Sequence, residues 1–181
     1  KNQLLSLEST SYPGTTRELI FQKIYKFNVG KDFFLVYSPE REDPGRNTKN
    51  LIIPKIVTGY SKKCLELGKI LYKNISKKIV LMDSLELGEM TKLYENIFRS
   101  VNIGLVNEIK KICFQMKLNI FDIINAADTK PFGFYKFLPG PGLGGHCIPI
   151  DPFYLQWKAK QIGIKTEFIH LAGVVNRSMP L

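Results

Sequence analysis

The alternation of apolar and polar residues divides the sequence into two parts of different character. Up to residue 83, amphipathic stretches alternate with short apolar runs, and Leu4–Leu7, Phe33–Tyr37 and Ile79–Met82 have the length of buried strands. A fourth run, Ile52–Val57, contains Pro54, which favours an edge strand or an irregular start. Because strands that alternate with helices are typical of βαβ units, this part predicts a Rossmann-like parallel α/β sheet.

Helix signals and polar turns lie between these runs. Thr15-Thr16-Arg17-Glu18 has the form of a capping box, and a second helix is expected over Ser61–Asn74. Glu8-Ser9-Thr10 and Ser38-Pro39-Glu40 each follow a predicted strand, whereas Asp43-Pro44-Gly45 marks a loop. Ligands of open α/β sheets bind beyond the carboxyl ends of the strands, so the first two segments are candidate binding positions. An ordinary polar turn also explains either segment taken alone.

After Asp83 the pattern changes to one long helical repeat. Asp83 and Glu86 can form a capping box. Apolar residues then recur at steps of three and four: Met90, Leu93, Ile97, Val101, Leu105, Ile109, Ile112 and Met116. They predict an amphipathic helix of about 30 residues and about 45 Å. This is long for a compact domain, so we expect the helix to link domains or to build a homodimer interface.

Three shorter helices are expected after the long one, over Phe121–Ala127, Pro152–Ile162 and Phe168–Arg177. Asp151 precedes the second of these as its N-cap, with Pro152 at the first helical position. The predicted fold class is therefore α/β followed by mostly α. We expect residues 1–83 to be the end of a Rossmann-like domain and residues 84–181 to be a helical domain.

Composition and charge exclude several classes without changing this picture. Of the 181 residues, 44% are hydrophobic and 23% are charged, values typical of a globular domain and not of a disordered chain. Apolar runs long enough to span a membrane are not found. The net charge is +10, but the basic residues are mostly scattered Lys, which we interpret as solvated surface charge. An anionic small-molecule substrate is the better functional interpretation, and neither nucleic acid nor a membrane is an expected partner.

The cysteines exclude a disulfide framework and make a metal site unexpected. There are three, with two His and no C-x-x-C pair. Cys64 and Cys113 lie in apolar helical patterns and are expected to be buried thiols. This usage fits a reducing cytoplasm.

Cys147 stands in a different setting, a Gly- and Pro-rich segment. The segment reads Pro139-Gly140-Pro141-Gly142-Leu143-Gly144-Gly145-His146-Cys147, and Asp151 opens a helix four residues later. Glycines let backbone N–H groups approach a ligand closely, and a loop next to a helix start can expose and activate a thiol. The alternative is an ordinary Gly-rich connection with an incidental Cys.

Lys92 and Asn96 form a second candidate pair on the long helix. Four residues apart, they share one face with Arg99 and Ser100, opposite the apolar positions. A cation and an amide donor can stabilise a developing oxygen anion. A simple solvated helix face is the alternative.

Several motifs together, in this order, resemble the UDP-glucose/GDP-mannose dehydrogenase family. They are Ser38-Pro39-Glu40-Arg41, Lys92-x-x-x-Asn96 and the segment Gly142 to Asp151. Glu8 to Thr16 and Thr129 to Phe134 resemble the branch that acts on UDP-N-acetylhexosamines, in particular the UDP-N-acetylglucosamine 6-dehydrogenases. The resemblance covers essentially the whole chain.

The resemblance implies oxidation of the sugar C6 alcohol to a carboxylate in two NAD-dependent steps, for polysaccharide biosynthesis. Cys147 would bind the aldehyde as a thiohemiacetal that becomes a thioester, so that no free aldehyde escapes. Lys92 and Asn96 would stabilise the oxygen anion at C6.

The resemblance also implies contacts to water, cofactor and substrate. Asp151 and Thr10 would hold the catalytic water, and Glu40 would be the general base of thioester hydrolysis. The cofactor-binding residues would be Ser9, Thr10, Glu40 and Cys147. The substrate would contact the loop glycines and a second group, in part across a homodimer: Gly142, Gly144, Gly145, Lys130, Phe134 and Tyr135.

The sequence also departs from the family pattern. A second acidic role cannot be assigned between Glu42 and Asp43, and the Gly-rich dinucleotide fingerprint does not occur in the 181 residues. We therefore expect a central segment that is inactive by itself. Two other classes stay open: a non-catalytic helical dimerisation module, and a Cys hydrolase with His146 or His170 as base.

Overall fold

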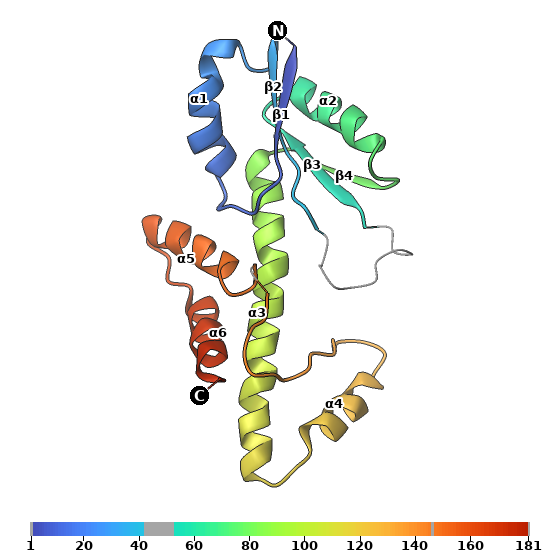
Figure 1. Ribbon diagram of the computed structural model, residues 1–181, viewed down its shortest axis with the longest axis vertical. Coiled ribbons are helices and arrows are strands. Elements are labelled where there is room, and N and C mark those ends of the chain that lie inside the picture. Colours follow the sequence, from blue (N-terminus) through green and yellow to red (C-terminus); the bar gives the residue numbers. More distant parts are fainter. Residues whose placement is uncertain (1, 42–52, 146, 181) are drawn as a thin grey trace. The chain divides into compact units, whose positions relative to one another are not determined.

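The computed structural model describes residues 2–41, 53–145 and 147–180 (Figure 1). The chain forms two compact units, residues 1–94 and 95–181. The predictions for the Asp43-Pro44-Gly45 loop, Glu42, Ile52 and His146 lie outside the described residues.

The first unit is built on a four-stranded mixed sheet in the order β1-β2-β3-β4. The strands are β1 (Gln3–Leu7), β2 (Phe33–Tyr37), β3 (Lys55–Gly59) and β4 (Ile79–Met82). The pairs β1–β2 and β3–β4 are parallel, as expected. The pair β2–β3 is antiparallel, so the prediction of an all-parallel sheet is wrong at this point. A parallel neighbour needs a crossover that is usually helical, and the sequence between β2 and β3 carries no helical pattern.

Helix α2 (Lys62–Lys73) covers one face of this sheet, as Figure 1 shows. Its N-cap is Ser61, whose side chain accepts a hydrogen bond from the backbone N–H of Cys64. The core between helix and sheet consists of Phe34, Val36, Val57, Cys64 and Tyr72. The apolar face of α2 thus packs on β2 and β3 and forms the hydrophobic core of the first unit with them.

A short irregular helical segment follows β1. It is made of a π-helical turn, η1 (Thr16–Phe21), then α1 (Gln22–Ile24) and a 3₁₀ turn, η2 (Tyr25–Phe27). The capping box predicted at Thr15 is wrong, because Thr15 already has a helical backbone and its hydroxyl donates to the Tyr12 carbonyl oxygen at 2.7 Å.

The predicted long helix is confirmed as α3 (Leu85–Gln115), which has 31 residues and continues from the first unit into the second. Ser84 caps it, accepting from the backbone N–H of Leu87 at 3.2 Å. The capping box of Asp83 and Glu86 is therefore wrong, and the Glu86 carboxylate instead accepts from Arg17 Nε at 2.7 Å.

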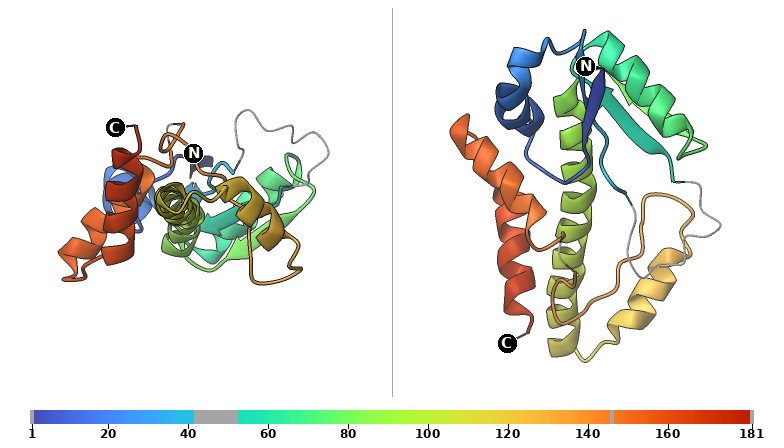
Figure 2. Two further views of the ribbon diagram at one scale, coloured as in Figure 1. Left: turned by 90° about the horizontal axis from the view of Figure 1, so that it is seen from below. Right: turned by 45° about the horizontal axis from the view of Figure 1, so that its top comes forward.

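The second unit is helical throughout. Helices α4 (Ile120–Asp128), α5 (Asp151–Gln161) and α6 (Glu167–Ser178) surround the C-terminal part of α3. Both views of Figure 2 place α4 on one side of α3 and α5 with α6 on the other. Cys113 on α3 forms a small core with Ile120 and Ile124 of α4. These are the three shorter helices predicted from the sequence, within a residue or two at each end.

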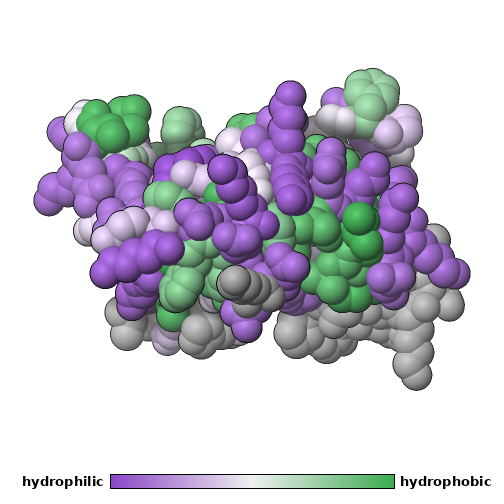
Figure 3. Space-filling model, turned by 90° about the horizontal axis from the view of Figure 1, so that it is seen from above, coloured by the Kyte–Doolittle hydropathy of each residue, from purple (hydrophilic) through white to green (hydrophobic). Residues whose placement is uncertain are grey.

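Polar and apolar side chains are mixed on the molecular surface drawn in Figure 3, where hydrophilic side chains alternate with apolar patches. Within the described residues, no helix combines the length and the apolar character that crossing a membrane requires.

Candidate active site

The carboxyl ends of β1 and β2 lie side by side in the first unit. Leu7 is paired with Tyr37, and the segments that follow stay together. The Ser38 N–H donates to the Leu7 carbonyl oxygen at 3.0 Å, and the Glu40 N–H donates to the Glu8 carbonyl oxygen at 3.2 Å. The two polar segments singled out in the sequence therefore begin at one edge of the sheet, where α/β proteins bind their ligands.

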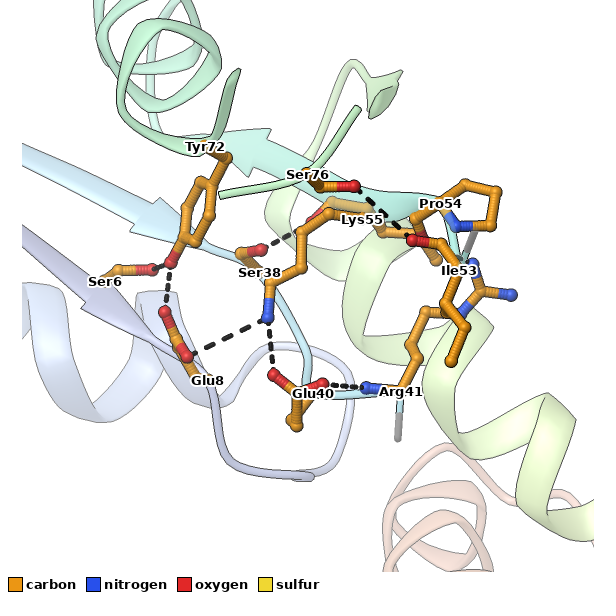
Figure 4. Close-up of polar contacts among 11 residues, drawn as sticks. Ser6, Glu8, Ser38, Glu40, Arg41, Ile53, Pro54, Lys55, Tyr72 and Ser76 are labelled. Carbon is orange, nitrogen blue, oxygen red and sulfur yellow. Dashed lines mark hydrogen bonds and ion pairs between the residues drawn. The ribbon is translucent and has the colours of Figure 1, made fainter. Parts of the chain in front are cut away.

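A buried cation joins two acidic side chains at this edge (Figure 4). Lys55 is 9% exposed. Its Nζ lies 2.8 Å from Glu40 Oε2 and 3.9 Å from Glu8 Oε2. Tyr37 is opposite Thr58 in the antiparallel pair, and continuing that register by three residues sets Glu40 opposite Lys55. Two partly solvated carboxylates thus compensate the desolvated ammonium group.

Tyr72 of α2 completes this cluster. Its hydroxyl donates to Glu8 Oε1 and lies 2.6 Å from Ser6 Oγ, and its ring lies 5.4 Å from Lys55 Nζ. Burial, reinforced by the hydrogen bond to Glu8, raises the pKa of Tyr72 to about 12. Tyr72 is therefore a neutral donor at physiological pH and orients Glu8. Sequence reasoning missed Lys55 and Tyr72, since a Lys at a strand start and a Tyr in an amphipathic helix carry no distinctive signal.

Glu89 is a third residue that the sequence did not single out. It lies fully buried on α3 and accepts from the Gly14 N–H at 2.5 Å, the Thr16 N–H at 2.8 Å and Thr16 Oγ1 at 2.6 Å. Burial raises the pKa of Glu89, and the three hydrogen bonds act in the opposite direction. Glu89 thereby ties the turn that follows Ser9 and Thr10 to the start of α3.

Hydroxyl groups at the carboxyl end of β1 fit a dinucleotide cofactor. Ser9 is exposed and Thr10 is half-buried. Within the described part of the chain, the Ser11 hydroxyl oxygen is buried without a hydrogen-bond partner. A buried hydroxyl without a protein partner, at the ligand-binding edge of a parallel strand pair, can bond a ribose or an amide.

Asn96 and Asp151 meet in the second unit. Asn96 Nδ2 donates to Asp151 Oδ2 at 2.6 Å, and both residues are buried. Arg99 donates from Nη2 to Asn96 Oδ1, so the orientation of the amide is determined on both sides. The prediction that Asp151 caps α5 is wrong: Asp151 is the first residue of the helix, and its carboxylate bonds Asn96 instead.

The face of α3 that carries Lys92 and Asn96 is buried. Lys92 lies one turn before Asn96 and is 7% exposed. The buried residues on this face, which we call the polar stripe, are Lys92, Asn96, Ser100, Gly104 and Asn107. Leu105 and Ile112 of the apolar positions are about half exposed. The alternative of a solvated helix face is therefore wrong.

Cys147 is exposed, whereas Cys64 and Cys113 are buried, as expected. The Cys147 carbonyl oxygen accepts from the N–H groups of Ile150 at 3.1 Å and Asp151 at 2.8 Å, which places the thiol in the turn before α5. The described residues include no group of His, Cys, Asp and Glu that could hold a metal ion.

A hollow of about 260 Å³ lies against this loop in the second unit. Pro141, Gly142 and Ile148 of the loop region line it together with Phe153 and Arg177. The Arg177 guanidinium lies 5.1 Å from the centre of the Phe153 ring. The hollow therefore has mainly apolar walls and one cation, Arg177.

The remaining predicted substrate residues lie toward α4. Phe134 and Tyr135 line a hollow of about 150 Å³ with residues of α3 and α4, and Tyr135 packs edge-on against Phe98. Lys130 Nζ lies 5.0 Å from the centre of the Phe132 ring. His170, considered as a hydrolase base, has its Nδ1 3.5 Å from Gln156 Nε2.

Two family models match the chain. Residues 1–76 match the NAD binding domain of the UDP-glucose/GDP-mannose dehydrogenase family, and residues 86–178 match its central domain. The chain belongs to this family. The resemblance read from the sequence motifs is confirmed.

Relatives and solved structures agree with this assignment. The UDP-N-acetyl-D-mannosamine dehydrogenase of Pyrococcus horikoshii is 36% identical over 99% of this chain and 43% of its own length. The UDP-N-acetyl-D-glucosamine 6-dehydrogenase of Pseudomonas aeruginosa is 38% identical over 96% of this chain and 42% of its own. A solved structure of the P. horikoshii UDP-D-ManNAc dehydrogenase superposes with a TM-score of 0.88 at 37% identity, over 98% of this chain and 42% of that one. The chain thus spans less than half the length of these relatives.

Proposed function

We propose that this chain is the catalytic centre of a nucleotide-sugar 6-dehydrogenase that oxidises C6 of a UDP-N-acetylhexosamine to the uronic acid. The observation that carries the proposal is the exposed Cys147 on a Gly-rich loop whose next helix begins with the buried Asn96–Asp151 hydrogen bond. Residues 1–83 would be the end of the NAD-binding domain, and residues 84–181 the central domain.

Cys147 is the proposed covalent catalyst. Its thiolate adds to the C6 aldehyde carbon, which gives a thiohemiacetal, and oxidation of that adduct leaves an acyl group on sulfur. Water then attacks the thioester, the C–S bond breaks, and the carboxylate and the thiol are released. Asn96 Nδ2 has a second hydrogen besides the one donated to Asp151, and with the Lys92 ammonium it would stabilise the negative oxygen at C6.

Hydrolysis of the thioester needs a positioned water and a base. Asp151 and Thr10 are the proposed water ligands, and the Glu40 carboxylate, held by Lys55, would accept the water's proton. NAD, when bound, supplies the hydride acceptor for the two oxidations. Ser9, Thr10, Glu40 and Cys147 are its proposed contacts, and the orphaned Ser11 hydroxyl supports this fit.

Substrate and partners follow from the branch of the family. The named relatives act on UDP-N-acetylmannosamine and UDP-N-acetylglucosamine, so an N-acetylated UDP-hexosamine is the proposed substrate class and a polysaccharide the destination of the product. The proposed substrate contacts are Gly142, Gly144, Gly145, Lys130, Phe134 and Tyr135. Three unpaired thiols support a cytoplasmic setting.

A homodimer through α3 is part of the proposal, because its C-terminal half exposes Leu105, Ile112 and Phe114. Sedimentation velocity of the chain and of Leu105→Glu tests it. A dimer that the substitution dissociates is expected, and a monomeric parent chain would contradict the interface.

The catalytic proposal is tested in a chimaera in which this chain replaces the stretch of the P. horikoshii enzyme to which it aligns. With NAD and either UDP-N-acetylglucosamine or UDP-N-acetylmannosamine, we expect two NADH per sugar oxidised, and Cys147→Ser should abolish the reaction. The isolated chain should reduce no NAD. A chimaera that folds but leaves both sugars unoxidised would refute the proposed function.

A further inference from the structure

Two buried asparagines connect α3, α6 and the Gly-rich loop. The Gly140 N–H donates to Asn107 Oδ1 at 2.9 Å, and Asn107 Nδ2 donates to Asn176 Oδ1 at 3.1 Å. Asn176 Nδ2 in turn donates to the Ser100 carbonyl oxygen at 3.0 Å. Asn107 is 0% exposed and Asn176 is 3% exposed. Burying two primary amides costs free energy unless their N–H and C=O groups are hydrogen-bonded. Here both amides belong to one series of hydrogen bonds that ends at Gly140 in the loop.

A close approach of α3 and α6 makes this network possible. A Cβ added at Gly104 would lie 3.3 Å from Ala172 Cα and 3.3 Å from Asn176 Nδ2. Small residues on both helices thus bring the backbones close enough for the two amides to meet. The Gly104 position is one turn before Asn107, on the same polar stripe.

The loop touches α6 at a second point. Gly142 has φ +121°, a conformation that favours glycine, and a Cβ at this position would lie 2.9 Å from the Asn176 carbonyl oxygen. The backbone of Asn176 therefore contacts the loop at Gly142. This contact lies two residues after Gly140, which the asparagine network holds. Asn176 therefore contacts this short segment in two ways: its side chain acts through Asn107, and its carbonyl group packs against Gly142.

The segment around Cys147 is consequently held at both ends by one face of α3. Asn107 bonds Gly140 before the cysteine, and Asn96 bonds Asp151 after it. Eleven residues separate the two asparagines, which corresponds to about three helical turns, so both side chains leave the same side of the helix. Between these two hydrogen bonds, Cys147 is exposed.

We propose that Asn107 and Asn176 are positioning residues that hold the N-terminal end of the Cys147 loop, as Asn96 holds its C-terminal end. The catalytic consequence rests on the proposed function, whereas the anchoring itself is a property of this chain. Loss of the anchor removes the hydrogen bond at the N-terminal end of the loop, while Gly142 still packs against α6 and Asp151 still bonds Asn96. The Gly140 amide then exchanges freely and the thiol samples more orientations.

The test compares three variants of the 181-residue chain. Asn107→Leu removes both functions of the amide. Asn107→Asp keeps the oxygen that accepts from Gly140 while placing a charge in the core. Asn102→Leu is the control, because within the described residues the Asn102 side chain bonds only the Phe98 carbonyl oxygen of its own helix.

Two quantities are measured: hydrogen exchange at the Gly140 amide by NMR, and the rate at which iodoacetamide alkylates Cys147, with the buried Cys64 and Cys113 as internal references. In Asn107→Leu we expect exchange at Gly140 about 10-fold faster or more and alkylation of Cys147 at least threefold faster. Asn107→Asp should lower the melting temperature yet keep Gly140 protected. That rescue separates positioning of the loop from general stability.

Gly140→Pro is a fourth variant, which changes the loop itself and removes the donor without touching either helix. It should accelerate alkylation of Cys147 as Asn107→Leu does, even if Asn107→Leu fails to fold. Alkylation at the parent rate in Gly140→Pro, or Gly140 exchange in Asn107→Leu equal to that of Asn102→Leu, would overturn the proposal. An inactive chimaera would refute the proposed function and leave both of these results unchanged.

Discussion

Asn96 and Asp151, 55 positions apart in the sequence, share a buried hydrogen bond of 2.6 Å. One residue comes from the middle of the long helix and the other from the first position of α5. Their contact fixes the start of α5, and with it the turn that presents Cys147, against α3. The bond joins a neutral amide to a carboxylate in the interior. Removing the amide should therefore cost more stability than removing the carboxylate, because a buried charge is the more costly group to leave without its donor.

Asn96→Ala should destabilise the chain by about 2–3 kcal/mol, because it leaves the Asp151 carboxylate buried without this donor. Urea unfolding followed by circular dichroism measures the change. Asn102→Ala, which lies on the same helix with a local hydrogen bond only, should cost less than about 0.5 kcal/mol. Equal midpoints for the two variants would show that the Asn96–Asp151 bond contributes little.

Lys55→Met should slow thioester hydrolysis more than the oxidations, because Glu40 loses the ammonium group that holds it at 2.8 Å. In the chimaera, stopped-flow absorbance at 340 nm should show a rapid burst of about two NADH per site, the two oxidations of one sugar, followed by slow turnover. Lys55→Arg should restore most of the steady rate, and Lys69→Met, on the exposed side of α2, should match the parent. A uniform fall in burst and steady rate in Lys55→Met would instead indicate a structural defect.

Tyr72 predicts a stability change at alkaline pH. Its pKa is raised from 10.0 to about 12, so above pH 10 the unfolded state loses the phenolic proton first and the folded state loses stability. The stabilisation that Tyr72 adds relative to Tyr72→Phe should therefore be constant below pH 10 and shrink as the pH approaches 12. Absorbance at 295 nm should show that Tyr72→Phe has one fewer tyrosine with a raised pKa than the parent chain. A gap that widens above pH 10 would contradict the burial of this hydroxyl.

Gly142→Ala should cost about 1–3 kcal/mol, because φ is +121° and the new Cβ would lie 2.9 Å from the Asn176 carbonyl oxygen. Gly144→Ala is the matched control in the same loop, since among the described residues no atom beyond its chain neighbours lies within 4 Å of its Cβ position. Thermal unfolding measures the difference. If both variants melt at the same temperature, Gly142 does not seat the loop on α6.

The local pattern of apolar and polar residues was sufficient to predict most helices and strands of this protein. The apolar runs Phe33–Tyr37 and Ile79–Met82 are the strands β2 and β4, and the steps of three and four after Asp83 gave the 31-residue α3. Burial of Cys64 and Cys113 followed from the same periodicity. These features depend on near neighbours in the sequence, so the sequence alone predicts them.

The direction of β3 and the burial of the polar face of α3 could be learned only from the tertiary structure. The antiparallel pairing of β2 with β3 is what sets Lys55 beside Glu40, and an all-parallel sheet would not have this pair in register. The polar stripe on α3 has the composition of a solvated face, yet α5, α6 and the Gly-rich loop supply hydrogen-bond partners for Asn96 and Asn107. Likewise, Asp151 has the sequence context of a helix cap but bonds Asn96.

The sequence by itself therefore determined the apolar strands, the long helix and the family, and it named the candidate catalytic residues, which stay a prediction. Only the tertiary structure decided which of those residues are buried and what they bond. The physical reason is that periodicity reports how a side chain is placed on its own element. The partner of a buried polar group comes from another element, often more than 50 residues away, and no local pattern encodes that choice.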